Sequence, residues 1–277
     1  MNNRPEIILQ CREAARRMRC DALSISFAAG SSGAHLGGGL SMIEIMAVLY
    51  RGVMHYDAQN PFLEERDRFI LSKGHGVLAF YTALNQAGFI SDTELLSFKS
   101  NNTFLYGHPS MNLQKGIEFS SGSLGLGLSL GVGSALALNR KSNATSRIFV
   151  LMGDGECNEG SVWEAAASAA HFGLQNLVAI IDKNGLQYDG NTCGVMSMES
   201  MADKWASFGW QVLEVDGHDV AVLYDALSTI SSKPIVVIAH TVKGKGVSFM
   251  ENNPAWHHAR LTQAQFEQAM AEQEVIL

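Results

Sequence analysis

The sequence lacks the features that would place the chain outside the cell or in a membrane. Arg and Glu residues interrupt the first twenty positions, so we expect no signal peptide, and no apolar run reaches the length of a membrane span. The 4 cysteines, at positions 11, 20, 157 and 193, are widely spaced and follow no metal-ligand pattern. We therefore expect free thiols, no membrane partner and a soluble, cytoplasmic protein, with Cys157 as a small loop-filling residue.

An excess of basic residues is also absent. The formal net charge is −7, which argues against a nucleic-acid partner. A phosphorylated ligand would have to be held locally, by a metal, backbone amides and a few His or Lys side chains. Repeats, low-complexity segments and obvious linkers are missing too, so we expect one domain over residues 1–277.

Glycine, in contrast, is abundant at 27 residues, and two glycines frame the central turn of the chain. The apolar run Ile148 to Met152 predicts a strand that breaks at residues 153–155, Gly-Asp-Gly, where the backbone can turn tightly and approach a ligand. A second apolar run, Leu177 to Ile181, stops at residues 182–185, Asp-Lys-Asn-Gly. We expect a βαβ unit in an α/β fold with a doubly wound, mostly parallel sheet and helices on both faces.

The helix of this unit is predicted from Trp163 to Phe172. It is alanine-rich, and Ser161 followed by Glu164 has the spacing of a capping box.

Parallel strands open their carboxyl ends on one side of a sheet, so Asp154 and Asn184 should face one crevice. A carboxylate, an amide oxygen and a backbone carbonyl near Leu186 are hard oxygen ligands. They are too few to enclose a metal but suffice to hold a Mg²⁺ that a diphosphate also chelates. The alternative is an ordinary doubly wound unit with a Gly-Asp-Gly turn, and the spacing to Asn184 favours the metal site.

Four histidines recur in predicted loops, and three of them directly follow a glycine or another small residue. His35 lies in a Gly-rich loop, His75 follows a short strand in a Gly-His-Gly turn, His108 precedes a proline, and His257 lies in the stretch MENNPAWHH. A lone loop histidine is usually incidental, so the interpretation depends on whether these four meet in space. His218 is expected to be structural or exposed.

Further elements follow from periodicity and from capping signals. We predict an amphipathic helix over residues 5–28, an apolar helix opened by residues 122–127 and ending near Leu138, a helix over 219–231, and strands over 211–215 and 235–239. Ser41 with Glu44, Ser91 with Glu94, and Thr262 with Gln265 have capping-box spacing. The stretch Lys243-Gly244-Lys245-Gly246 could touch phosphate or lie in solvent, and we favour solvent.

The Gly-Asp-Gly turn, followed about 30 residues later by an asparagine at a strand end, resembles the diphosphate motif of thiamine-diphosphate enzymes. That resemblance implies that Asp154, Asn184 and the carbonyl of Leu186 bind the metal and that the amide of Gly155 meets the diphosphate. Within this group, further stretches resemble transketolase along nearly the full chain. They are AHLGGGLS, RDRFILSKGH, GHP, GSLGLG and KGKGVSFMENNPAWH.

The resemblance covers the amino-terminal, diphosphate-binding domain of transketolase and implies its fold. It therefore predicts one subunit of a split transketolase, active with a pyrimidine-domain partner chain, as an α2β2 heterotetramer. Such an enzyme cleaves a ketose, here expected to be a phosphate, next to its carbonyl and passes the two-carbon unit to an aldose. Thiamine diphosphate serves as electron sink.

The resemblance also implies residue roles. It places four histidines in the substrate channel as proton donors and acceptors: His35, His75, His108 and His257. The residues predicted to bind the cofactor are Gly122, Ser123, Leu124, Gly153, Gly155, Glu159, His75 and His257. Glu159 matches a glutamate at a subunit interface of the family, and the acid that activates the cofactor belongs to the partner chain.

The sequence departs from the usual transketolase pattern at three places. AHLG replaces GHPG around His35, HHAR follows Trp256 where HG is usual, and Tyr188 occupies a position where an aliphatic residue is expected.

Three alternatives remain at this point. The alpha subunit of a 2-oxo acid dehydrogenase shares the metal motif but should lack the LSKGH, GHP and NNPAWH stretches. Deoxyxylulose-phosphate synthase is a longer single chain. A non-catalytic homologue would bind the cofactor without turnover, which the four histidines disfavour.

Overall fold

One parallel sheet organises the computed structural model, which describes residues 3–141 and 145–274. Its strand order is β1-β2-β3-β7-β6, and every neighbouring pair is parallel. The strands are β1 (Arg68–Leu71), β2 (Ile148–Gly153), β3 (Leu177–Lys183), β6 (Gln211–Asp216) and β7 (Ile235–His240). A separate antiparallel pair joins β4 (Leu186–Gln187) to β5 (Gly190–Asn191). The mostly parallel α/β fold predicted from sequence is confirmed.

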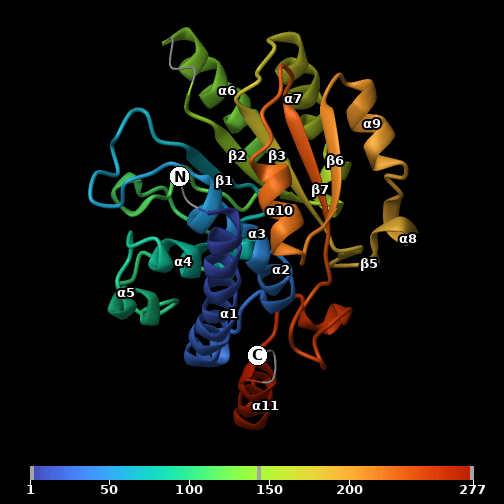
Figure 1. The fold of residues 1–277 in the computed structure, drawn as a ribbon. Helices are drawn as coiled ribbons and strands as arrows, with labels where there is room; N and C mark the ends of the chain where they lie inside the picture. Colours follow the sequence, from blue (N-terminus) through green and yellow to red (C-terminus); the bar gives the residue numbers. More distant parts are fainter. Residues whose placement is uncertain (1–2, 142–144, 275–277) are drawn as a thin grey trace.

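Helices cover both faces of this sheet (Figure 1). One buried cluster joins α1, α3, α4 and α10 to one face, and a second joins α6, α7 and α9 to the other. The helices are α1 (Arg4–Ala28), α2 (Leu36–Leu40), α3 (Ile43–Val48), α4 (Val77–Gln86), α5 (Asp92–Leu96), α6 (Gly127–Arg140), α7 (Gly160–His171), α8 (Thr192–Met196), α9 (Met201–Ser207), α10 (Val220–Leu227) and α11 (Gln263–Glu274). Across these described residues, no helix combines the length and the apolar character needed to cross a membrane.

The central unit runs β2–α7–β3. Both β2 and β3 are rich in β-branched and other apolar residues, as is typical of strands buried on both faces of a sheet. The two strands pair in parallel, and Gly153 lies opposite Asp182. The Gly-Asp-Gly turn and the Asp-Lys-Asn-Gly turn therefore leave the same edge of the sheet.

Two predicted capping boxes exist and one in the central unit does not. Ser91 and Glu94 cap α5 reciprocally, and Thr262 and Gln265 exchange two hydrogen bonds before α11. The box predicted for α7 is wrong, because α7 begins earlier, at Gly160, and the Ser161 hydroxyl donates instead to the carbonyl of Gly125. A tertiary partner replaces the local one.

Helix α6 also differs from the prediction, since it begins at Gly127 instead of Gly122. The preceding turn contains Gly125 at φ +84°, and a Cβ there would approach that of Glu159 to 2.6 Å. The GSLG segment is therefore a turn packed against the start of α7 and not the first turn of α6.

Candidate functional site

A cavity of about 440 Å³ lies at the carboxyl ends of the central strands. Most of the residues predicted from sequence line it: His35, His75, His108, Gly122, Leu124, Gly153, Asp154, Gly155, Glu159, Asn184, Leu186 and His257. Of the predicted set, Ser123 is not among the lining residues, although both its neighbours are. Segments far apart in the chain thus converge on one site.

The predicted metal ligands lie together at the floor of this cavity. Asp154 accepts hydrogen bonds from the amides of Gly155 (2.9 Å) and Gly185 (2.8 Å), and Asn184 Oδ1 accepts from the amide of Leu186 (3.1 Å). The turn after β2 is therefore bonded directly to the turn after β3. Burial, and next the neighbouring charge of Asp182, raise the pKa of Asp154 above its usual range, so a cation beside it would relieve an unfavourable charge.

A buried ion pair that sequence reasoning missed lies beneath these ligands. Lys73 pairs with Asp182, and their side chains are 2% and 0% exposed. Burial by itself would raise the pKa of Asp182, but the charge of Lys73 and hydrogen bonds outweigh it, so that pKa is lowered. Asp182 also accepts from Asn184 Nδ2 at 3.2 Å, which turns the amide oxygen of Asn184 away from this carboxylate. The short LSKGH and DKNG stretches contained both residues, but neither motif shows that they pair.

Ser41 takes part in the same network, so the capping box predicted for Ser41 and Glu44 is wrong. The hydroxyl of Ser41 contacts the carboxylate of Asp182 and the carbonyl of Gly38, and α3 begins at Ile43 without a side-chain cap.

Lys243 also belongs to the site. Its side chain is buried, and its Nζ donates to the carbonyl oxygen of Leu186 at 2.9 Å and lies 3.1 Å from His257 Nδ1. The solvent position favoured from sequence is therefore wrong for Lys243, although it holds for Lys245, which is partly exposed and pairs with Glu251. Burial, and next the charge of Lys73, lower the pKa of Lys243 to about 8.

The four predicted histidines form one cluster centred on His35. Its ring centroid lies 5.5 Å from those of His75, His108 and His257. A fifth imidazole, His258, approaches His35 to 4.6 Å. Sequence reasoning assigned no role to His258, although the doubled histidine in AWHH was visible as a departure from the transketolase pattern.

Burial is the main cause of the low pKa of these imidazoles. The pKa of His35 falls to about 3, with the charges of His258 and His257 as the next causes. The pKa of His257 falls to about 4, and that of His75 lies well below its usual range. Neutral imidazoles carry one donor and one acceptor nitrogen each, so at neutral pH the cluster can donate hydrogen bonds to a ligand and accept hydrogen bonds from it.

The walls of the cavity are fixed by Glu156, which the sequence did not single out. Its carboxylate accepts from the amides of Gly125 (2.9 Å) and Gly153 (3.1 Å), so it ties the GSLG turn to the Gly-Asp-Gly turn.

Cys157, the next residue in the chain, is buried, and burial raises the pKa of its thiol well above the usual range. The prediction of Cys157 as a loop-filling residue is consistent with the structure. Tyr188 is 73% exposed, and its ring stands 5.2 Å from that of His257.

Polar atoms without a partner point to a ligand in this cavity. Among the described residues, Asn158 Oδ1 and Gln187 Oε1 are buried without a hydrogen bond, and both residues line the cavity. Buried polar atoms are rarely left unpaired in native proteins. A ligand that donates to them would satisfy both.

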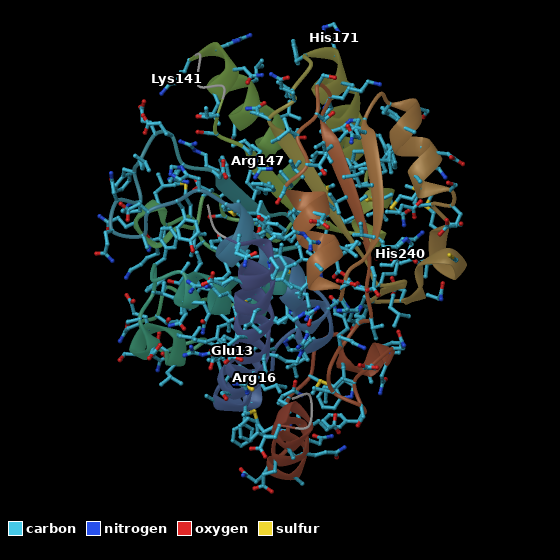
Figure 2. The ribbon with its side chains drawn as sticks, in the orientation of Figure 1. Glu13, Arg16, Lys141, Arg147, His171 and His240 are labelled. Atoms are coloured by element: carbon cyan, nitrogen blue, oxygen red, sulfur yellow. The ribbon has the colours of Figure 1, made fainter. Side chains whose placement is uncertain are left out.

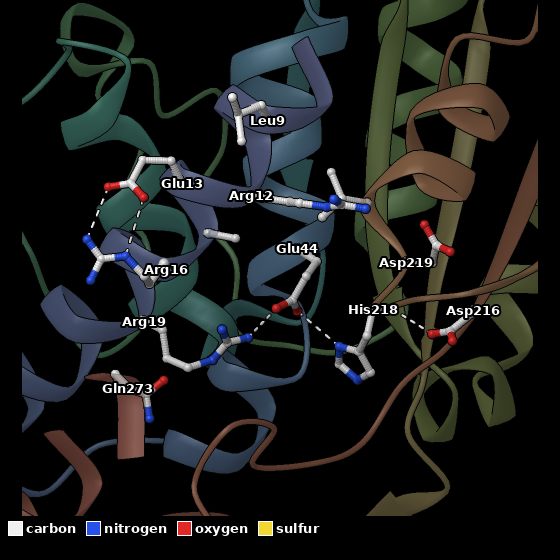
Figure 3. A pocket seen from close by; sticks show the side chains of 12 residues that line it. Leu9, Arg12, Glu13, Arg16, Arg19, Glu44, Asp216, His218, Asp219 and Gln273 are labelled. Atoms are coloured by element: carbon white, nitrogen blue, oxygen red, sulfur yellow. Dashed lines mark hydrogen bonds and ion pairs between the residues drawn. The ribbon is translucent and has the colours of Figure 1, made fainter. Parts of the chain in front are cut away.

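A larger cavity of about 510 Å³ lies beside α1 and contains none of the predicted site residues among those that line it (Figure 3). Here Glu44 pairs with Arg19 and with His218 Nδ1, the latter at 3.0 Å. His218 Nε2 accepts from the amide of Val242 (2.8 Å), and Arg19 Nε donates to the carbonyl of Lys245 (3.1 Å). His218 is thus structural, one of its two predicted roles, and the network anchors the loop that carries Lys243.

Comparison with known proteins identifies the family. The family model described as "Transketolase, thiamine diphosphate binding domain" matches residues 11–273. The chain belongs to the transketolase family. This confirms the resemblance stated from the motifs and favours a transketolase over the 2-oxo acid dehydrogenase alternative.

Two relatives that the chain matches over most of their length are named as transketolase subunits. The chain is 44% identical to an apulose-4-phosphate transketolase subunit of Phocaeicola vulgatus, over 86% of this chain and 85% of that protein. It is 40% identical to the "6-deoxy-6-sulfo-D-fructose transketolase subunit SqwG" of Clostridium sp., over 87% and 88%. Both relatives are named as subunits, and the chain spans most of each. The recognition of the chain as the amino-terminal subunit of a split transketolase is thereby confirmed.

Longer transketolases match over only part of their length. Human transketolase is 37% identical over 94% of this chain but 41% of its own length. The solved transketolase from Leishmania mexicana superposes with a TM-score of 0.87 at 29% identity, over 95% of this chain and 41% of that one. The chain therefore spans about two fifths of these longer transketolases and shares their α/β fold.

Proposed function

We propose that this chain holds the diphosphate and the metal of thiamine diphosphate in a two-chain transketolase that moves a two-carbon ketol unit from a ketose to an aldose. The observation that carries the proposal is the meeting of Asp154 with the loop from Asn184 to Leu186, in the cavity that the four predicted histidines also line. That arrangement joins a hard-oxygen cation site to groups able to handle protons.

The residues present fit a Mg²⁺ ion. Asp154, Asn184 and the carbonyl of Leu186 offer one carboxylate, one amide and one backbone oxygen, and Mg²⁺ bound through few protein ligands normally takes the rest from phosphate and water. The raised pKa of Asp154, caused first by burial and next by Asp182, supports a cation at this place. The carbonyl oxygen of Leu186 accepts one hydrogen bond from Lys243 and has a second lone pair.

The residues also fit a diphosphate and a flat ring system. The amide of Gly155, His75, His257 and Lys243 would hold the diphosphate, because all four line the cavity beside the metal ligands. The rest of the cofactor would be supported by the other residues predicted to bind it: Gly122, Ser123, Leu124, Gly153 and Glu159. When bound, the cofactor supplies an electron sink for cleavage of the bond next to a ketose carbonyl.

The histidines would move the protons that are exchanged when the ketol unit leaves the ketose and when it adds to the aldose. His75, His108 and His257 each lie 5.5 Å from His35, so neighbouring hydroxyls of a sugar can meet different rings. Each ring can take a proton from a sugar hydroxyl or return one to an alkoxide oxygen. Burial, and next the charge of Lys73, lower the pKa of His75 and so favour its neutral form.

We propose that the second half of the site comes from a pyrimidine-domain partner chain in an α2β2 assembly, with Glu159 at the subunit interface. The subunit names of the Phocaeicola and Clostridium relatives support a separate partner. Their names also support a phosphorylated or sulfonated ketose as donor.

We propose one domain over residues 1–277 and a location in the cytoplasm, which the free cysteines support.

The test is reconstitution of this chain with a pyrimidine-domain subunit. We expect the chain alone to be inactive and the pair to transfer ketol units from a ketose phosphate. Asp154→Ala and Asn184→Ala should abolish Mg²⁺-dependent cofactor binding by calorimetry in the pair, whereas Asp225→Asn, on the exposed surface, should not. Activity of the purified chain alone would refute the split site. Cofactor binding by the pair without turnover of any ketose would support the non-catalytic alternative.

A further inference from the structure

Two groups outside the roles assigned above, His258 and Lys99, lie beside the histidine cluster. His258 stacks edge-on against His35 at 4.6 Å, and its Cε1 lies 3.2 Å from the place that a Cβ on Gly33 would take. Lys99 reaches the same glycine from the segment after α5, because its Nζ donates to the carbonyl of Gly33 at 2.7 Å. Gly33 therefore has His258 on one side and Lys99 on another.

Lys99 also borders His108. A Cβ placed on Gly107 would lie 3.4 Å from Lys99 Nζ, and Gly107 precedes His108 in the chain. His108 and His258 are both exposed, whereas Lys99 is half-buried. Lys99 thus lies close to His108 and shares Gly33 with His258, which in turn contacts His35, a residue that lines the cavity.

The charge of Lys99 is not neutralised by an acid. Its Nζ donates to the carbonyls of Gly33 and, at 3.4 Å, of Ser32, and no ion pair joins it to a carboxylate within residues 3–141 and 145–274. A half-buried ammonium without a carboxylate partner leaves a positive charge that a bound anion could neutralise.

The neighbouring imidazoles respond to that field. Burial is the first cause of the lowered pKa of His35, His108 and His258, and the charge of Lys99 is a further cause for all three. Positive charge is thus unfavourable at all three rings, so an anion bound beside them would be stabilised.

We propose that Lys99, His108 and His258 form an oxyanion subsite that binds the terminal phosphate or sulfonate of the sugar substrate. The ammonium supplies charge, and the two imidazoles supply N–H donors, which together suit a tetrahedral group with several acceptor oxygens. This inference rests on the proposed ketol transfer for its biological ligand. It assigns a part of substrate selection to this chain.

The kinetic test uses the reconstituted pair with matched acceptors, glyceraldehyde 3-phosphate and glyceraldehyde. In Lys99→Met and His258→Asn we expect kcat/KM for the phosphorylated acceptor to fall about tenfold or more, mainly through KM, because a hydrogen bond to a charged group is lost. The value for glyceraldehyde should stay within about twofold. Lys99→Arg, which keeps the charge, should restore most of the preference.

A matched control is Lys141→Met. Lys141 is exposed at the end of α6, at the opposite end of the molecule from α11, and should leave both acceptors unchanged (Figure 2). Equal losses for both acceptors in Lys99→Met and His258→Asn would overturn the subsite and leave the proposed ketol transfer intact. An acceptor ending in a sulfonate separates the two anion types, and preference for either supports the subsite.

A binding test decides the subsite even if no ketose is turned over. The full chain is titrated with inorganic phosphate while the imidazole C–H signals of His108 and His258 are followed by NMR, with His258→Asn used for assignment. We expect saturable shifts of both signals that disappear in Lys99→Met. The absence of shifts, or equal shifts in Lys99→Met, would overturn the proposal.

Discussion

Lys73 and Asp182 form an ion pair that is almost fully removed from solvent, directly under the strand ends that carry the predicted metal ligands. The carboxylate of Asp182 is shared further by the hydroxyls of Ser41 and Thr241 and by the amide of Asn184. The floor of the site is therefore a polar network in which each member has a partner.

Breaking this pair on one side should destabilise the chain strongly. We expect Lys73→Met to lower the free energy of unfolding by about 3–5 kcal/mol, because it leaves the buried Asp182 charge without its partner. Chemical denaturation followed by circular dichroism measures the change. Asp225→Asn, which breaks an exposed pair with Arg4, is the control and should leave the midpoint nearly unchanged. A small effect of Lys73→Met would contradict the burial of the pair.

The histidine cluster should make the fold sensitive to mild acid. In the unfolded chain these imidazoles titrate near their usual pKa of 6.5, whereas the folded pKa is about 3 for His35 and about 4 for His257. Below pH 6.5 the unfolded state therefore binds more protons, so the free energy of unfolding should fall as pH drops from about 6.5 to 4.5. The measurement is a series of denaturant titrations across this range.

The same series separates the cluster from the buried acid Glu44. Burial opposes ionisation of Glu44, but Arg19 and His218 outweigh it and lower its pKa to about 2, so its contribution is lost only below the usual 4.5. His35→Gln should flatten the slope between pH 6.5 and 4.5. His171→Gln, at the exposed end of α7 (Figure 2), is the control and should not alter it. An unchanged slope in His35→Gln would contradict this explanation.

Glu44 should also control the loop that carries Lys243. We expect Glu44→Gln to weaken the pair with Arg19 and to speed hydrogen exchange at the amides of residues 242–246, because Arg19 and His218 both bond that loop. The matched control is Glu13→Gln, which breaks the exposed pair with Arg16 beside the same cavity (Figure 3). Equal protection of residues 242–246 in both variants would argue against the anchoring role.

The two lysines of the KGKG stretch should behave differently towards the cofactor. Lys243→Met should raise the Kd of thiamine diphosphate for the assembled pair by about tenfold or more, because Lys243 lies in the cavity against Leu186. Lys245→Met should not, since Lys245 pairs with Glu251 near the surface. Calorimetry with inorganic pyrophosphate as well as the cofactor shows whether the diphosphate is the group recognised. Equal affinities in the two variants would contradict the assignment.

The sequence by itself predicted the parallel sheet and the residues at its strand ends. Apolar runs interrupted by Gly-Asp-Gly and by Asp-Lys-Asn-Gly are local patterns, and the right-handed crossover brings their ends to one edge whatever the remaining contacts are. Capping succeeded where the helix end is exposed, as at Ser91 with Glu94. It failed at Ser41 and Ser161, whose hydroxyls have partners elsewhere in the chain.

The tertiary structure alone decided which charged groups share the site. Lys73 meets Asp182 across 109 residues of sequence, and Glu44 meets His218 across 174, distances over which no local pattern carries information. No local pattern predicts the hydrogen bonds from Lys243 to the carbonyl of Leu186 and from Lys99 to the carbonyl of Gly33 either. Ionisable side chains take their partners from the three-dimensional packing, because burial and neighbouring charge, which set their energies, exist only once the chain has folded.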